Sequence, residues 1–381
     1  MIAKLFLFCF FLVNFTQAEL YWSGKVNIPY SFYLKGLGNT QNPMRFIELN
    51  VNYGLENIDL KTNTAFEYGW HENNYSPVNF REYYLSYYPS FGEINIGKQI
   101  ITWGIADGNN PTDNINPYNL NYMFETGVDR KVGIHSLSSI IYYNDIKLNL
   151  VLSYDNINNV KNERLPLPLP ESQNNNNFEY GFDFQYSMNE IEFSLSYLIK
   201  KNIPILTFSS DNTTLASESN VKILGLNLLY LYDEIAIRAE NALFLAKNDE
   251  QFYQGIIQLE LPEIFNFTIG SQLFGTYNIN NSASGIYSIG SPIMLLTEAS
   301  PLLVNSLSRS FNDDNIELNI FTMFEIIDGY GFSIGFETNY NILDNLKTSF
   351  NFSKFSKGNH KSAFNTLSDY SNIKLNIEYY F

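Results

Sequence analysis

The chain has 381 residues and a formal net charge of −16 at pH 7; 16% of its residues are aromatic and 16% are charged. An average soluble domain has about 25% charged residues, so this chain has few charged residues. Its aromatic content is well above that of a typical soluble domain. The negative charge argues against nucleic acid and anionic lipid as electrostatic partners. No segment approaches the roughly 18 consecutive apolar residues that a transmembrane helix requires.

The first 18 residues have the features of a secretory signal peptide. A basic start at Lys4 precedes the apolar run Leu5–Val13, and the small residues Thr16 and Ala18 precede a cleavage point before Glu19. Cys9 is the only cysteine and lies in this leader, so the mature chain is expected to have no disulfide, thiol nucleophile or cysteine-bound metal. Residues 19–381 are expected to form a single domain.

Apolar and polar residues alternate along the whole mature chain, in runs of which most have about 9–14 residues. Such runs lie at 20–34, 47–53, 146–155, 178–186, 191–199, 265–277 and 330–340. Alternation puts apolar side chains on one face of a strand and polar side chains on the other. Strands of soluble sandwiches are nearer 5–6 residues, whereas a tilted strand needs about 9–11 to cross a bilayer. The pattern predicts an all-β, transmembrane antiparallel up-and-down β-barrel; a soluble all-β protein is the alternative.

Short turns and long connections alternate, which is typical of such barrels. Long loops are expected at about 36–44, 72–79, 104–129, 157–177, 201–220, 246–250, 278–315 and 357–371. Seventeen strands are readily found, and a further strand near Ser284–Leu296 would return both termini to the same side. The prediction is about 18 strands, with 16 as the main alternative.

The last strand, Ile373–Phe381, is apolar at every second residue and ends on an aromatic residue. It resembles the C-terminal signal of bacterial outer-membrane β-barrel proteins, which the barrel-insertion machinery reads. The resemblance implies an outer-membrane location, with outer-membrane lipid and lipopolysaccharide as surroundings. The sequence does not decide whether the barrel is a monomer or a trimer.

A second resemblance lies between Gly97 and Leu120, where Gly97-Lys98-Gln99 is followed by Trp103-Gly104 and a loop rich in Asp, Asn and Pro. This segment resembles one shared by porin-like families that include the alginate-export-like barrels, although Lys98 stands where arginine is usual. The resemblance covers about 75–130 and implies an outer-membrane channel for small polar solutes or sugars.

The third long loop, 104–129, is expected to fold into the lumen and narrow it, because its glycines and prolines allow a compact fold. The candidate constriction residues are Asp107, Asp113 and Asn116, with Arg81 and Arg130 supplying the opposing charge. The other interpretation is that these side chains only stabilise turns and ion pairs. The acidic composition suggests a preference for cations.

Other functions have weaker support from the sequence. The spacing of Asp107, Asn109 and Asp113 lacks the pattern of an EF-hand calcium loop, so no metal or cofactor is expected. A hydrolase would need an activated serine or water, but His135 and Ser136 are adjacent and so face opposite sides of a strand. His71 and His360 are expected at loop tips or strand ends, where they would be solvated, so no enzyme activity is expected. A non-conducting adhesin or structural barrel remains the alternative to a channel.

Overall fold

The computed structural model describes residues 19–35, 44–68, 78–108, 110–122, 125, 127–154, 160, 178–208, 214–246, 251–279, 286–288, 301–360, 362 and 364–381. The signal-peptide prediction, His71, Asn109 and most of the predicted loops at 36–44, 72–79 and 157–177 lie outside these residues. Among the described residues, no helix is long and apolar enough to cross a membrane.

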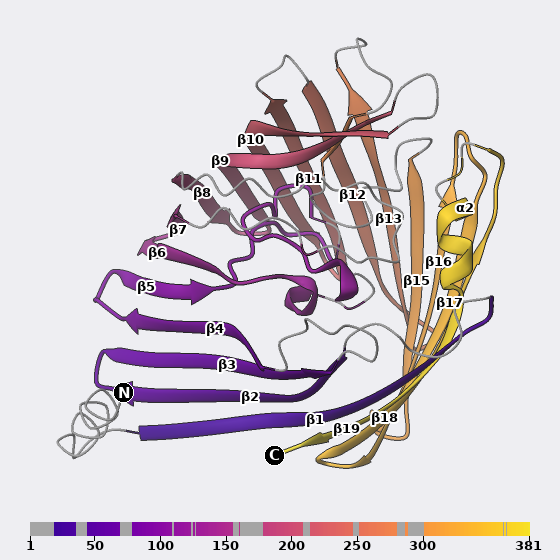
Figure 1. Ribbon diagram of the computed structural model, residues 1–381, viewed down its shortest axis with the longest axis horizontal. Coiled ribbons are helices and arrows are strands. Elements are labelled where there is room, and N and C mark those ends of the chain that lie inside the picture. Colours follow the sequence, from indigo (N-terminus) through magenta and orange to yellow (C-terminus); the bar gives the residue numbers. More distant parts are fainter. Residues whose placement is uncertain are drawn as a thin grey trace.

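Antiparallel strands form one closed sheet around a lumen (Figure 1). β1 pairs with β2 on one side and with β19 on the other, which closes the ring. The strands of the wall are β1 (Glu19–Tyr33), β2 (Met44–Leu55), β3 (Ile58–Tyr68), β4 (Val78–Tyr87), β5 (Gly92–Gln99), β6 (Ile134–Tyr143), β7 (Ile146–Ser153), β8 (Glu179–Met188), β9 (Ile191–Phe208), β10 (Thr214–Tyr232), β11 (Ile235–Ala246), β12 (Gln251–Ile264), β13 (Phe267–Asn278), β15 (Leu302–Phe311), β16 (Ile316–Glu325), β17 (Phe332–Leu343), β18 (Leu346–Ser356) and β19 (Asn372–Tyr380).

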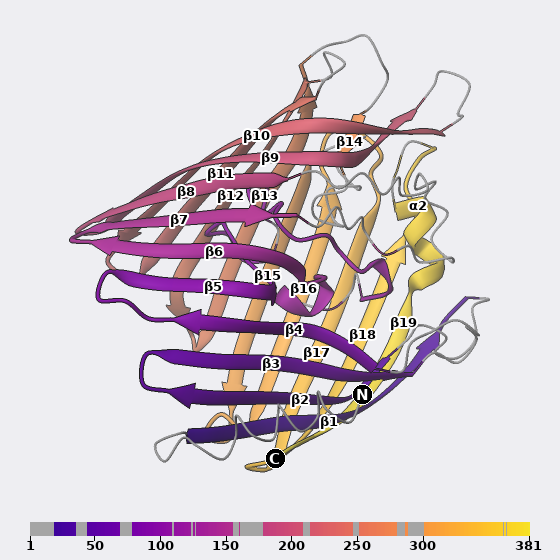
Figure 2. The same ribbon diagram turned by 60° about the vertical axis from the view of Figure 1, so that its left-hand side comes forward.

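The wall therefore has 18 strands, which confirms the predicted number, but the position predicted for the hidden strand is wrong. β13 pairs directly with β15 (Leu302–Phe311), so this segment completes the wall. The three-residue strand β14 (Ile286–Ser288) pairs with β9 at Ile205–Thr207, beyond the part of β9 that pairs with β8 (Figure 2). Alternation is incomplete on β15, because Leu302 and Val304 share the face of Ser306 and Ser308 and pack in an apolar cluster with residues of the connection after β5.

The predicted loop at 201–220 is also wrong, because β9 continues to Phe208 and β10 begins at Thr214. Backbone pairing continues through this extension, with a register shift between Ser219 and Val221. The predicted loop at 357–371 is confirmed between β18 and β19, where it contains the short helix α2 (Phe364–Leu367).

The barrel has a turn end and a loop end. Turns at the turn end contain non-glycine residues in the left-handed region, among them Asn144, Asn189 and Asp233, which suits asparagine and aspartate better than other residues. Each of these residues lies in a short turn between paired strands, as the predicted alternation of short turns and long connections requires. The carboxyl-terminal strand also ends here, where Phe381 exchanges backbone hydrogen bonds with Gly24.

The outward face of the wall is mainly apolar, whereas the inward face carries buried polar side chains together with apolar side chains that pack against the connection after β5. On β19, Leu375, Ile377 and Tyr379 are half exposed on the outside, whereas Asn376 on the opposite face is buried. A ring of 18 strands is too wide for wall side chains alone to fill. The contents of the lumen therefore depend on the connections at the loop end.

Candidate functional site

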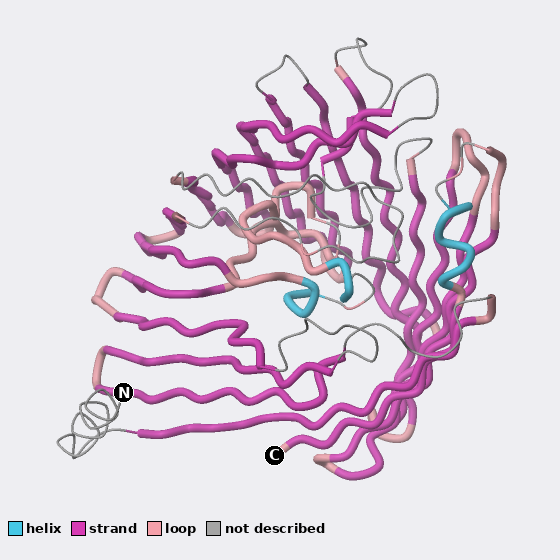
Figure 3. Tube along the Cα trace, in the orientation of Figure 1, coloured by secondary structure: helices cyan, strands magenta, loops and turns pink. Residues whose placement is uncertain are grey.

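One long connection, residues 100–133 between β5 and β6, lies between the opposing walls of the barrel; we call it loop 3 (Figure 3). It is longer than the predicted 104–129, because β5 ends at Gln99 and β6 begins only at Ile134. Within it, η1 (Leu120–Tyr122) and η2 (Gly127–Arg130) are single short turns.

Glu240 on β11 binds the first half of loop 3. Its Oε2 accepts hydrogen bonds from the backbone N–H groups of Ile105 (2.9 Å) and Ala106 (3.1 Å). Its Oε1 accepts two more from Thr112, from the backbone N–H (2.9 Å) and the hydroxyl (2.7 Å). The Glu240 side chain is fully buried, so these four donors replace the water that a carboxylate would otherwise need.

Gly104 allows the backbone of loop 3 to come close to the Glu240 carboxylate. Its φ of +96° is a backbone conformation that favours glycine, and a Cβ at this position would lie 2.7 Å from both Glu240 oxygens. The Trp103-Gly104 pair noted in the sequence therefore has a structural reason, because the loop can rest on Glu240 only without a side chain here.

Asp113 and Asn116 stabilise the fold of loop 3 itself. Asp113 forms a buried ion pair with Lys131 and accepts a hydrogen bond from the Trp103 N–H (3.2 Å). Asn116 accepts from the Ile101 N–H (2.7 Å) and donates to two backbone carbonyls at the base of the loop. Burial lowers the pKa of Lys131, and the charge of Asp113 acts in the opposite direction. Neither side chain is open to the lumen in this arrangement.

Asp107 is placed differently, because its side chain is 70% exposed. Its carboxylate accepts a hydrogen bond from Gln258 on β12 and lies 3.7 Å from the Arg238 guanidinium on β11. Its backbone carbonyl accepts from Gln272 on β13 (2.8 Å). Of the five candidate residues, it is the one whose charged group reaches open space.

Arg81 and Arg130 lie at the second half of the loop. Arg81 on β4 pairs with Glu48 on β2 (3.0 Å) and with Asp129 (3.2 Å), and it donates to the Val128 carbonyl (2.9 Å). Arg130 donates to the Gly108 carbonyl within the loop, and its guanidinium lies 5.5 Å from the Tyr118 ring centre. Both arginine side chains are buried.

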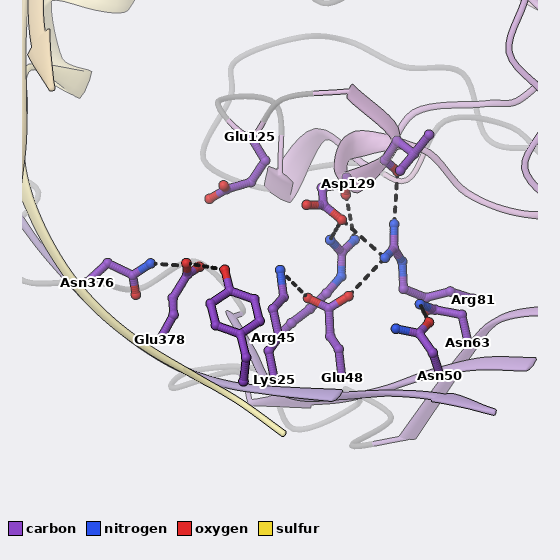
Figure 4. A network of polar contacts seen from close by, with 12 residues as sticks. Lys25, Arg45, Glu48, Asn50, Asn63, Arg81, Glu125, Asp129, Asn376 and Glu378 are labelled. Carbon is purple, nitrogen blue, oxygen red and sulfur yellow. Dashed lines mark hydrogen bonds and ion pairs between the residues drawn. The ribbon is translucent and has the colours of Figure 1, made fainter. Parts of the chain in front are cut away.

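Further cations attach the second half of the loop to the wall (Figure 4). Arg45 on β2 pairs with Glu67 (3.2 Å) and Asp129 (3.4 Å), and Lys374 on β19 pairs with Glu125 (2.7 Å). On the other side, Lys200 on β9 donates to the Ile115 carbonyl (2.7 Å). Loop 3 is thus bonded to β19, β2 and β4 at one end and to β9 and β11–β13 at the other.

Sequence reasoning did not identify Glu240, Arg45, Glu48 or Lys200 as site residues. The available signal was weak: each is a charged residue at a lumen-facing position of a predicted strand, as many other residues are. What distinguishes them is a partner more than 80 residues away or on another strand, which alternation does not indicate.

An apolar cluster joins loop 3 to the last connection of the chain. Tyr118 and Leu120 of loop 3 belong to the same buried cluster as Phe364 and Leu367 of α2, together with Tyr370. Val160, from the connection after β7, exchanges backbone hydrogen bonds with Tyr118 and Leu120. Three connections therefore meet at the loop end of the lumen.

Two cavities border loop 3. One, of about 340 Å³, lies between the start of the loop and the lumen faces of β4–β8. The other, of about 250 Å³, lies between the second half of the loop and strands β1, β2 and β19. Both are lined mainly by polar side chains, which suits the passage or binding of hydrophilic solutes.

The groups considered for catalysis or metal binding are not assembled into such a site. His135 is exposed on the outer face, in contact with the Tyr83 hydroxyl (2.5 Å), whereas Ser136 is buried on the opposite face. His360 is exposed in the last connection. Within the described ranges, no group of three or more His, Cys, Asp or Glu residues is arranged to hold a metal ion.

Comparison with known proteins gives structural likeness only. No family model matches the chain, and no curated protein sequence matches it. Among solved structures, it resembles the outer membrane protein opdK of Pseudomonas aeruginosa with a TM-score of 0.59 and 10% identity, over 95% of this chain and 99% of that one. Acinetobacter baumannii OccAB3 gives 0.58 and 10%, over 96% and 99%. Pseudomonas aeruginosa OccK2 (OpdF), solved in complex with glucuronate, gives 0.56 and 9%, over 96% and 98%. The chain therefore has the closed 18-strand barrel fold of bacterial outer-membrane porins.

Proposed function

We propose that this chain is a porin-type channel of a bacterial outer membrane, through which small polar solutes diffuse passively. The observation that carries the proposal is loop 3, which is bonded to both sides of a lumen that the wall cannot fill. Ion pairs hold one end of it at Arg45 and Arg81, and Glu240 holds the other. A loop fixed at both ends narrows a pore to a constant cross-section, which is what selection by size and polarity requires.

The outer-membrane location is supported by the fold and by the half-exposed apolar residues of the outer face, which suit contact with lipid. We infer that residues 1–18 direct export and that the strand ending at Phe381 is read by the insertion machinery. Outer-membrane lipid and lipopolysaccharide would then surround the barrel.

Among the five predicted constriction residues, Asp107 is the best candidate for contact with a passing ion. Its carboxylate is exposed, whereas Asp113, Asn116, Arg81 and Arg130 are buried. We propose that Asp107 contributes a preference for cations and that the other four maintain the shape of the loop.

The test is conductance of the refolded mature chain in a planar bilayer, with the reversal potential measured in a salt gradient. Stable current steps with a reversal potential that favours cations would support the proposal. A barrel that folds, as judged by heat-dependent gel mobility, but gives no current would contradict it.

A non-conducting adhesin or structural barrel is the second candidate, and one observation favours it. The buried cluster of Tyr118, Leu120, Phe364 and Leu367 places apolar side chains at the loop end of the lumen, where an open channel would have polar ones. The bilayer measurement separates the two functions.

A further inference from the structure

The cavity of about 250 Å³ between loop 3 and the wall has a definite chemical character; we call it the β1–β19 cavity. It could hold about eight waters at roughly 30 Å³ each, which is room for a solute the size of a monosaccharide. Some of its side chains, among them Arg45, Glu48 and Glu378, are labelled in Figure 4. The lining includes Lys25 and Asn27 of β1, Arg45 and Glu48 of β2, Lys374, Asn376 and Glu378 of β19, and Asn121, Tyr122, Glu125 and Asp129 of loop 3.

The cations of this cavity are already neutralised. Lys25 pairs with Glu48 at 3.0 Å, and Lys374 pairs with Glu125 at 2.7 Å. Arg45 is bonded to two carboxylates, one of them Asp129. An anionic solute would have to displace a carboxylate from one of these pairs, so the cavity offers it little net attraction.

Glu378 is the exception among the carboxylates. It accepts hydrogen bonds from the Asn376 side-chain amide (3.1 Å) and the Tyr380 hydroxyl (2.8 Å), and it forms no ion pair with any residue that the structure describes. A carboxylate oxygen has room for more than one donor, so Glu378 can accept further hydrogen bonds from a solute.

The asparagine carbonyl groups next to Glu378 do not add open acceptors. Donation from Asn376 to Glu378 fixes which atom of this amide is nitrogen. Its Oδ1, and the Oδ1 of Asn27 on the neighbouring strand, have no hydrogen-bond partner among the described residues, but both atoms are buried. Glu378 is therefore the acceptor that carries the argument.

We propose that the β1–β19 cavity is a binding subsite for an uncharged, hydroxyl-bearing solute, such as a monosaccharide or a polyol of that size. Hydroxyl groups donate to Glu378 and accept from the lysine ammonium groups without breaking an ion pair. The inference rests on the proposed channel function and assigns to it a class of solute.

The test compares two probes of one ring size, D-glucose and D-glucuronate, as blockers of the single-channel current of the wild-type protein. We expect glucose to interrupt the current and glucuronate to need a concentration about tenfold higher, which corresponds to about 1.4 kcal/mol. Equal or stronger block by glucuronate would overturn the proposal.

Two variants locate the block. Glu378→Leu removes the carboxylate at similar volume and should weaken glucose block about tenfold, the effect of about one hydrogen bond. The matched control, Glu317→Leu, changes a glutamate of β16 that accepts hydrogen bonds from Asn319 and Asn339 and should leave glucose block unchanged. If glucose blocks Glu378→Leu as strongly as it blocks the wild type, the subsite is not here.

A third variant should reverse the preference. Glu125→Gln releases Lys374, and both side chains of this pair are partly exposed, so the barrel should fold normally. The freed ammonium group should strengthen glucuronate block; no change would count against the role of charge pairing. Current steps that neither glucose nor glucuronate blocks would contradict the proposed subsite alone. The absence of current steps would contradict the proposed channel function on which the subsite rests.

Discussion

Replacement of Glu240 by glutamine should release loop 3 while leaving the barrel intact. The wild-type carboxylate accepts two hydrogen bonds on each oxygen, from Ile105 and Ala106 and from Thr112. Glutamine has one carbonyl oxygen, and its amide nitrogen would face donors, so up to two of these bonds are lost. The wall does not depend on this residue, because its strands are held by backbone pairing.

The size of the effect can be worked from these contacts. A hydrogen bond to a charged group contributes about 1.5–3 kcal/mol, so two of them contribute roughly 3–6 kcal/mol. The glutamine side chain also avoids the cost of burying a charge, which offsets part of this loss. A net loss of roughly 3 kcal/mol corresponds to an increase of about 100-fold in the undocked population of the loop.

Limited trypsin digestion of the folded protein measures this population, because Arg130 and Lys131 are buried cleavage sites in loop 3. We expect Glu240→Gln to be cut there much faster than the wild type, and its single-channel current to be larger and noisier. Glu317→Gln is the control, since Glu317 bonds only to asparagines of β16 and β17. Wild-type resistance to trypsin together with wild-type current in Glu240→Gln would refute the role of this carboxylate.

Three other substitutions give different outcomes. Gly104→Ala should also undock the loop, because its Cβ would lie 2.7 Å from the Glu240 oxygens; trypsin resistance equal to that of the wild type would contradict this. Asp113→Asn leaves the buried Lys131 ammonium without its carboxylate, at a cost of about 3–5 kcal/mol, and should likewise give rapid cleavage. Asp107→Asn changes an exposed carboxylate, so it should keep trypsin resistance and shift the reversal potential away from cations; an unchanged potential would remove Asp107 from the selectivity site.

The wall could be predicted from the sequence because one rule governs it. Side chains alternate between two environments along a strand, so the lumen-facing and outward positions of β19 can be assigned from Ile373–Phe381 alone. The same rule failed at 201–220, where backbone pairing continues along β9 and β10 beyond the segments that alternate clearly. Between residues 278 and 315, the sequence predicted a strand near Ser284–Leu296, whereas the wall strand is β15. Both segments contain apolar residues, so the pattern did not distinguish them.

The interior of the lumen could be predicted only in part. Composition indicated that loop 3 would be compact, and Asp107 was identified as a candidate that proves to be exposed. The roles of Asp113 and Asn116 depend on which backbone groups the folded loop brings near them, and local sequence does not determine this. Glu240 was missed because its partners are about 130 residues earlier in the chain.

The net charge of the chain is a poor guide to what the lumen selects. Around loop 3, carboxylates and cations form pairs: Arg81 and Lys25 share Glu48, and Asp129 lies between Arg45 and Arg81. A paired charge has a field that falls off faster than that of a single charge, so its effect on a distant ion is small. Selectivity should therefore depend on carboxylates that form no ion pair with a described residue, such as Glu378, and on weakly paired ones such as Asp107. For this reason the same barrel can favour cations in a salt gradient and still hold an uncharged solute in the β1–β19 cavity.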